Sequence, residues 1–247
     1  LLIFDEIQKI PDWDKLIRTL YEKMRDCVIV ITGSNSSLLS SEIGSNLAGR
    51  FIGIFILPFS FSEYLLYENI VVKTEMDFYK QEESITRYFH LYVKFGGLPE
   101  VFTIHNEKAK YSYMEGILSK VILDDIIKRY GVRNTEVLEN ILKYLFLGTG
   151  KIVSFSRITN HLKNYGFDIK NSTVCTYINY IINTFCLYQL GRFDWKLQRV
   201  FSGNKKYYAV DMGIINLYDN LVSNYSRLLE NIVYLKLRGQ SKQVFFG

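Results

Sequence analysis

The chain has 247 residues, of which 48% are hydrophobic and 22% are charged, which fits one large or two medium globular domains. Its net charge of +5 permits contact with nucleic acid without requiring it. No apolar run reaches membrane-spanning length, and the three cysteines lack the spacing of a disulfide framework or a zinc site. We therefore expect a cytoplasmic protein with reduced thiols.

The chain begins with an apolar run that ends in two acids, Leu1-Leu2-Ile3-Phe4-Asp5-Glu6. This pattern predicts a buried parallel strand that places Asp5 and Glu6 at its carboxyl end. In ATPases with a phosphate-binding loop, one such carboxylate holds Mg²⁺ and its neighbour activates the attacking water. The alternative is an ordinary strand that ends in a solvated acidic turn, and the motif alone would favour that alternative.

A helix and a second apolar strand follow the acids. Apolar residues recur at helical spacing after Trp13, and residues 27–32 form another apolar run. A strand, a helix and a second strand predict a right-handed parallel unit of an α/β sheet. The second strand ends at Ser34 and Asn35, at the same sheet edge as the acids. These two residues can sense a γ-phosphate or simply form a polar turn.

Residues 51–57 predict a third strand, preceded by Arg50. Arg50 can neutralise phosphate charge in its own or a neighbouring subunit, or it can pair with a carboxylate at the sheet edge. Ser60 and Glu63 then have the spacing of a capping box that starts a helix. The pattern stays helical to about residue 130, with an interruption at Gly96-Gly97-Leu98-Pro99, which predicts a helical subdomain.

The next segment predicts a winged helix-turn-helix of α+β class. Its predicted elements are helices at 137–147, 154–162 and 172–190 and strands at 198–201 and 206–210. We expect Arg199, Lys205 and Lys206 to contact nucleic acid through the wing. The long helix has no Lys or Arg between residues 172 and 190, so DNA contact and protein packing both stay open.

Five motifs in order resemble one known family: residues 2–13 (LIFDEIQKIPDW), 32–34 (TGS), 47–50 (LAGR), 58–64 (PFSFSEY) and 96–100 (GGLPE). Together they are similar to prokaryotic AAA+-type ATPases that carry a C-terminal DUF4143 region. The resemblance implies ATP and Mg²⁺ as cofactors. It implies Asp5 as the Mg²⁺ ligand, and Glu6, Ser34 and Arg50 as catalytic residues. It also implies a closing restriction-endonuclease-like domain, whose first acidic position Glu230 matches.

The expected organisation is a partial parallel-sheet ATPase core (1–65), a helical subdomain (66–130), the winged helix (131–220) and the start of the last domain (221–247). No phosphate-binding motif G-x-x-x-x-G-K-[ST] occurs in the chain. We therefore expect a piece of a longer ATPase that is inactive alone, and whose partners are ATP, DNA through the winged helix, and further copies of itself. The alternatives are an adaptor built on a degenerate ATPase scaffold and a nuclease regulated by an ATPase.

Overall fold

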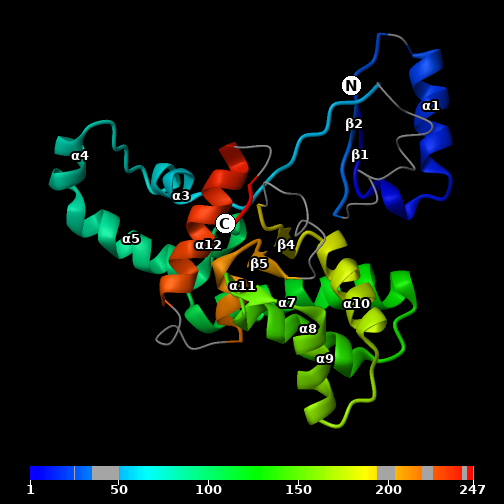
Figure 1. Cartoon of the computed structure of the whole chain (residues 1–247). Coiled ribbons are helices and arrows are strands. Elements are labelled where there is room, and N and C mark those ends of the chain that lie inside the picture. The colour runs from blue at the N-terminus through cyan, green and yellow to red at the C-terminus, as the bar shows by residue number, and fades with distance from the viewer. Residues whose placement is uncertain (25, 35–49, 194–203, 219–224, 241–243, 247) are drawn as a thin grey trace. The chain divides into compact units, whose positions relative to one another are not determined.

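The computed structural model describes residues 1–24, 26–34, 50–193, 204–218, 225–240 and 244–246. Its backbone forms two compact units (Figure 1). The first comprises Leu1–Ile56 with Asn183–Phe185, and the second comprises Leu57–Ile182 with Cys186–Gly247.

The first unit contains a two-stranded parallel sheet with one helix. Its elements are β1 (Leu2–Phe4), the 3₁₀ turn η1 (Ile7–Lys9), α1 (Trp13–Lys23) and β2 (Ile29–Ile31). Ile17 of α1 packs with the buried Ile7 against one face of the sheet. The other face presents Ile3 and Val30, which are 64% and 41% exposed. The predicted parallel strand–helix–strand unit is therefore confirmed. The expected burial of β1 is wrong, because only one face of the two-stranded sheet is covered and no residue of β1 is fully buried.

The predicted third strand is wrong for the described residues, because residues 51–57 form no strand. A strand needs a neighbouring backbone to satisfy its N–H and C=O groups. Among the described residues, β1 and β2 pair only with each other. Ile52, Ile54 and Ile56 are accordingly 90%, 84% and 86% exposed.

The second unit is mainly helical and includes a three-stranded sheet. Its elements are α3 (Phe61–Tyr67), α4 (Glu75–Lys80), α5 (Glu82–Phe95), α6 (Pro99–Thr103), α7 (Glu107–Lys120), the π-helix η3 (Val121–Lys128), α8 (Thr135–Leu147), β3 (Ile152–Val153), α9 (Phe155–Asn164), α10 (Asn171–Asn183), β4 (Leu187–Leu190), β5 (Lys205–Ala209), α11 (Met212–Asn216) and α12 (Tyr225–Gln240). The helices α4 and α5 extend away from the sheet (Figure 1).

The capping box predicted at the start of α3 is confirmed. The Ser60 hydroxyl accepts from the Glu63 N–H, and the Glu63 carboxylate accepts from the Ser60 N–H at 2.7 Å. These bonds satisfy N–H groups that the first turn of a helix leaves without partners.

The Gly96–Pro99 interruption has a structural reason, because it holds a buried acid from far along the chain. Asp211 is 1% exposed, and its carboxylate accepts from the N–H groups of Gly97 at 2.6 Å and Gly213 at 2.7 Å. Burial raises the pKa of the Asp211 carboxyl to about 6, while these backbone donors oppose the rise. We call the contact between Gly97 and Asp211 the clamp.

Besides the clamp, two further contacts join α11 and its neighbours to α5. The Asn216 amide donates to the carbonyls of Val93 at 2.8 Å and Lys94 at 2.9 Å, close to the end of α5. Gly213 approaches so closely that a Cβ there would lie 2.4 Å from the Phe95 carbonyl oxygen. Residues around α5 and α11 are therefore held as one packed body.

The sheet of the second unit has the strand order β3-β5-β4, with both pairs antiparallel. One predicted element differs, because the helix expected over 172–190 ends at Asn183 and residues 187–190 form β4. Phe185 adopts a left-handed φ of 60°, which stops the helix. The strand predicted at 198–201 lies outside the described residues, and β5 confirms the strand predicted at 206–210.

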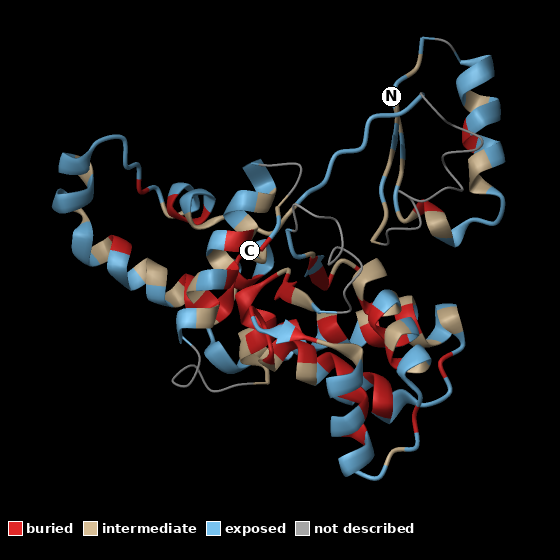
Figure 2. Ribbon diagram, in the orientation of Figure 1, coloured by how far each residue is buried: buried red, intermediate tan, exposed pale blue. Residues whose placement is uncertain are grey.

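One continuous core runs from α3 to α12. It joins Tyr64, Leu118, Ile141, Ile178 and Leu228 with their neighbours, and Figure 2 shows these buried segments in red around the sheet. The last helix thus packs on the same core as the segments expected to form separate domains. The boundaries at residues 130 and 220 stay predictions.

Asn231 fastens α12 to the sheet. Its side chain is fully buried, accepts from the Ala209 N–H at 2.9 Å and donates to the Ala209 carbonyl at 3.0 Å. The Asn231 amide therefore satisfies the backbone N–H and C=O of the last residue of β5, as a neighbouring strand would.

Replacing Asn231 with Ala should lower the free energy of unfolding by about 2–4 kcal/mol, because both backbone groups of Ala209 would be buried without partners. Urea unfolding followed by circular dichroism measures the change. Lys236→Ala on the exposed side of α12 is the control, expected within about 0.5 kcal/mol of the parent. Equal stability of both variants would show that α12 does not depend on this contact.

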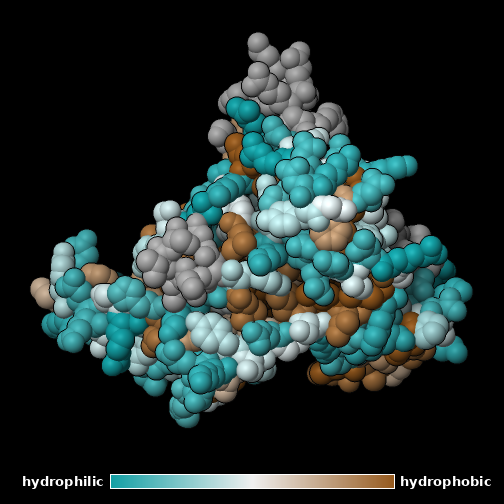
Figure 3. Space-filling view, turned by 90° about the horizontal axis from the view of Figure 1, so that it is seen from below, coloured by the Kyte–Doolittle hydropathy of each residue, from teal (hydrophilic) through white to brown (hydrophobic). Residues whose placement is uncertain are grey.

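The molecular surface mixes polar and apolar residues. Figure 3 shows hydrophilic residues over much of the face seen from below, with hydrophobic patches between them. Among the described residues, no helix has the length and apolar composition that crossing a bilayer requires.

Candidate functional site

The candidate site lies where the two parallel strands of the first unit end. β1 and β2 pair in register, with Phe4 opposite Ile31. The Thr32 N–H donates to the Phe4 carbonyl at 2.9 Å, and the Ile7 N–H donates to the Thr32 carbonyl at 3.1 Å. These bonds place the residues after both strands side by side, as expected for the carboxyl edge of a parallel sheet.

Asp5 and Thr32 contact each other across this edge. The Thr32 hydroxyl donates to a carboxylate oxygen of Asp5 and accepts from the Glu6 N–H at 3.1 Å. Both side chains are exposed. The hydroxyl thus fixes the Asp5 carboxylate while leaving it accessible to a ligand.

Glu6 lies beside Ser34 and Gln8. One oxygen of its carboxylate accepts from the Gln8 amide at 2.6 Å and from the Ser34 hydroxyl at 3.2 Å. Glu6 also has a left-handed backbone with φ of 51°. This conformation is uncommon for residues other than glycine, and the two side-chain donors hold the carboxylate in one direction.

The sequence reasoning missed two residues of this site, Thr32 and Gln8. The Gln8 Oε1 atom is buried and has no hydrogen-bond partner among the described residues. Gln8 follows the acids by two positions in the turn η1, and only the turn folds it back toward Glu6. Thr32 could have been found, because it is the last residue of the second predicted apolar run and lies two positions before Ser34.

Arg50 lies away from the two acids. Its guanidinium is 3.8 Å from the Glu22 carboxylate of α1 and lies over the Tyr21 ring. Glu22 also accepts from Arg18 at 3.0 Å, which makes a surface ion pair of modest energy. Asn35 lies outside the described residues. The structure thus brings Asp5, Glu6 and Ser34 together but not Arg50.

The donor atoms at the edge are suited to a hard cation. Asp5 and Glu6 offer carboxylate oxygens, and Thr32 and Ser34 offer hydroxyl oxygens. Mg²⁺ prefers oxygen ligands and is usually held by one or two carboxylates together with water and substrate phosphates. No group of three His, Cys, Asp or Glu side chains able to hold a metal occurs among the described residues. The carboxylate and hydroxyl oxygens present are compatible with Mg²⁺ as a ligand of this edge.

The three residues expected to contact nucleic acid through the wing differ in their structural contacts. Lys206 pairs with Glu230 at 2.9 Å, and the same Glu230 oxygen accepts from the Tyr208 hydroxyl at 2.8 Å. Lys205 pairs with Val153 in the antiparallel register, and Arg199 lies outside the described residues. Their contact with nucleic acid stays a prediction.

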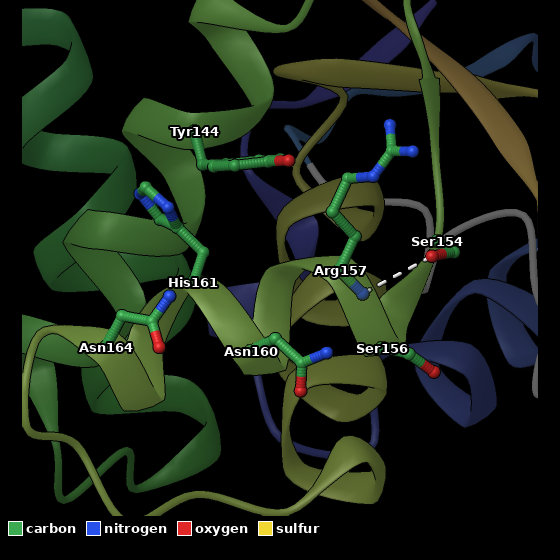
Figure 4. A pocket seen from close by; sticks show the side chains of 7 residues that line it. All are labelled: Tyr144, Ser154, Ser156, Arg157, Asn160, His161 and Asn164. Carbon is green, nitrogen blue, oxygen red and sulfur yellow. Dashed lines mark hydrogen bonds between the residues drawn. The ribbon is translucent and has the colours of Figure 1, made fainter.

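A second polar site occurs on the other unit, around α9. An open pocket of about 490 Å³ is lined by Tyr144, Ser154, Ser156, Arg157, Asn160, His161 and Asn164 (Figure 4). The side chains of Arg157 and His161 point to the same side of α9 as the Tyr144 ring. The sequence analysis did not single out these residues.

Two family models match the chain. Residues 1–65 match a model described as an AAA domain (AAA_14). Residues 86–225 match a domain of unknown function, DUF8612, which replaces the DUF4143 region expected from the motifs.

The chain is also similar to curated proteins. An uncharacterized protein of Methanocaldococcus jannaschii, MJ1544, is 34% identical over 240 residues, which cover 96% of this chain and 52% of the relative. An uncharacterized protein of Haemophilus influenzae is 33% identical over 245 residues, covering 98% and 59%. The chain thus spans little more than half the length of these relatives.

Proposed function

The chain belongs to the DUF8612 family. From the match of residues 1–65 to the AAA-domain model we propose that these residues form the hydrolytic half of an ATP-hydrolysing module in a longer protein. The observation on which the proposal rests is the network at the carboxyl edge of β1 and β2. There Asp5 is held by Thr32, and Glu6 is held by Ser34 and Gln8. The matched AAA region contains all of these residues.

Each acid has its own role in the proposal. Asp5 is the ligand of Mg²⁺, since its carboxylate is exposed and its direction is fixed by a hydroxyl. When bound, the cation neutralises charge on the phosphates. Glu6 orients the attacking water and accepts its proton, and the donors from Ser34 and Gln8 keep one carboxylate oxygen engaged so that the other can do so.

Ser34 and Gln8 act as positioning residues for Glu6. Both donate to the same carboxylate oxygen, and the amide of Gln8 also lies 3.4 Å from the Ser34 hydroxyl. A phosphate oxygen at this edge would compete for the Ser34 hydroxyl, and the bond to Glu6 would then loosen. Such an exchange would couple the nucleotide to the water-activating acid. The phosphate contact of Arg50 stays a prediction.

The second unit is the effector in this proposal. The helix α8, the strand β3, the helices α9 and α10 and the strands β4 and β5 follow one another in the order of a winged helix-turn-helix, with β5 between β3 and β4. We assign this architecture to residues 135–209. The clamp between Gly97 and Asp211 joins the segment that directly follows β5 to the turn after α5. In this proposal the winged helix and the preceding helices therefore respond together to the nucleotide.

ATP turnover by the longer protein, with Asp5→Asn as the variant, tests the proposal. Asn keeps the size of the side chain but is a weaker ligand for Mg²⁺, so we expect the half-saturating Mg²⁺ concentration to rise about tenfold or more. Asp26→Asn, which removes an exposed acid after α1, is the matched control and should leave the Mg²⁺ requirement unchanged. Binding of ATP without Mg²⁺-dependent turnover would instead identify an adaptor built on an ATPase scaffold.

A further inference from the structure

The pocket around α9 has the features of a site for a polyanion. We propose that it binds the phosphodiester backbone of nucleic acid, and we call it the α9 site. The proposal rests on the winged-helix arrangement proposed above but not on ATP hydrolysis. It places the contact on α8 and α9 rather than on the wing.

The sequence segment that carries the site contains charged residues of one sign. Between residues 140 and 167 the sequence contains four Lys or Arg residues and no Asp or Glu. All four, Lys143, Lys151, Arg157 and Lys163, are exposed. None of them forms an ion pair within the described parts of the chain, whereas Lys206 in the wing pairs with Glu230. Their charge is therefore available to an external anion.

Arg157 is placed to donate into the pocket. Its guanidinium makes one long bond, 3.5 Å to the Ile152 carbonyl, which leaves most of its N–H donors toward the solvent. Its own backbone N–H is bound by the Ser154 hydroxyl, which caps α9. The amides of Asn160 and Asn164 line the same pocket (Figure 4). Arginine and asparagine are common donors to phosphate oxygens.

Aromatic rings form one wall of the site. The His161 ring lies between those of Tyr144 and Tyr165, with centroid distances of 5.1 Å and 4.9 Å. Tyr165 is 71% exposed. Exposed rings beside cationic groups provide flat surfaces against which sugars or bases pack.

The α9 site lies next to α10, whose exposed face is polar and uncharged. The Asn171 amide at the start of α10 donates to the Ser156 hydroxyl of α9 at 3.4 Å, which joins the two helices. Ser172, Thr176 and Asn179 form an exposed polar stripe along α10. In helix-turn-helix proteins the first helix contacts the backbone and the second faces the groove. The α9 site thus corresponds to the backbone contact.

An extended polyanion suits the α9 site better than a small anion does. The pocket is open, and its polar groups are spread along α9 rather than gathered in a buried cradle. Lys143, Lys151 and Lys163 are not among the lining residues, but each is close in sequence to one of them. Several phosphates of one backbone could therefore be contacted by these lysines together with Arg157.

The test is fluorescence-anisotropy titration of the 247-residue chain with a labelled DNA duplex of about 20 base pairs, at salt concentrations from about 50 to 200 mM. Arg157→Gln and Lys163→Gln should each weaken binding about fivefold and reduce the slope of log affinity against log salt by about one. Lys108→Gln, which removes an exposed charge from α7, is the matched control and should change neither quantity. A single strand of the same sequence shows whether the backbone must be duplex.

Three outcomes would overturn the proposal. They are absence of DNA binding by the parent chain, equal weakening by Lys108→Gln, and displacement of the DNA by polyglutamate at equal charge concentration. The last would indicate an acidic protein partner. Glu6→Gln should bind DNA as the parent does, so failure of the ATPase proposal leaves the α9 site standing, and its failure leaves the ATPase proposal standing. Circular dichroism of each variant confirms that it is folded.

Discussion

Replacing Glu6 with Gln should reduce ATP turnover by the longer protein by about 10²-fold or more, while nucleotide affinity stays within about twofold. The substituted amide keeps an oxygen that can accept from Ser34 and from Gln8, so the local structure should persist. What the variant loses is the negative charge and basicity needed to take a proton from water. Single-turnover hydrolysis and equilibrium binding of a fluorescent nucleotide measure the two quantities separately.

The control for this substitution is Glu22→Gln on α1. It makes the same chemical change in the same unit, at a carboxylate that pairs with Arg18 and Arg50 at the surface. We expect it to hydrolyse ATP at nearly the parental rate. Hydrolysis by Glu6→Gln at the parental rate would remove Glu6 from the reaction. A large loss in Glu22→Gln would instead indicate that the pair between Glu22 and Arg50 takes part in catalysis.

Replacing Gly97 with Ala should destabilise the second unit by about 3–5 kcal/mol, the range of severe packing defects. A Cβ at this position would lie 2.1 Å from the Phe59 carbonyl oxygen. That oxygen accepts from the Tyr92 hydroxyl at 2.7 Å, and the Gly97 carbonyl accepts from the Phe59 N–H at 2.8 Å. Relief of the clash would therefore break bonds on both sides and open the clamp to Asp211.

Urea unfolding measures the effect, with two glycines as controls. Gly116→Ala in α7 adds a Cβ that meets nothing within 4 Å and should raise stability by about 0.5–1 kcal/mol. Gly131→Ala also meets nothing, but Gly131 has a φ of 60°, so it should cost about 1–2 kcal/mol. If Gly97→Ala is too unstable to purify, its soluble yield and protease resistance are compared with those of Gly131→Ala. Equal behaviour of these two variants would contradict the close packing at Gly97.

Local patterns predicted the elements near the candidate site well. The apolar runs and the helical period between them gave the parallel pair β1 and β2, because each signal lies within a few residues. Ser60 and Glu63 gave the start of α3 for the same reason. The third strand at residues 51–57 failed, since an apolar run does not reveal whether a partner strand lies beside it.

Contacts between distant residues were beyond prediction. Gly96 and Gly97 stood out in the sequence, but nothing in their neighbourhood pointed to Asp211, which is 114 residues from Gly97. Gln8 joined the site because a 3₁₀ turn reversed the chain after Glu6. Glu230 matched an expected nuclease position, yet in the fold it accepts from Lys206 and Tyr208. Sequence spacing alone does not indicate these partners.

The clamp also bears on how the polypeptide matures during translation. Gly97 leaves the ribosome long before Asp211 has been synthesised, so the packing at the end of α5 is complete only after a late part of the chain has been made. Local helices can form early, but their apolar faces are fully buried only after the segment that contains Asp211 has been synthesised. The nascent protein therefore passes through a period in which hydrophobic surface is open to chaperones or to aggregation.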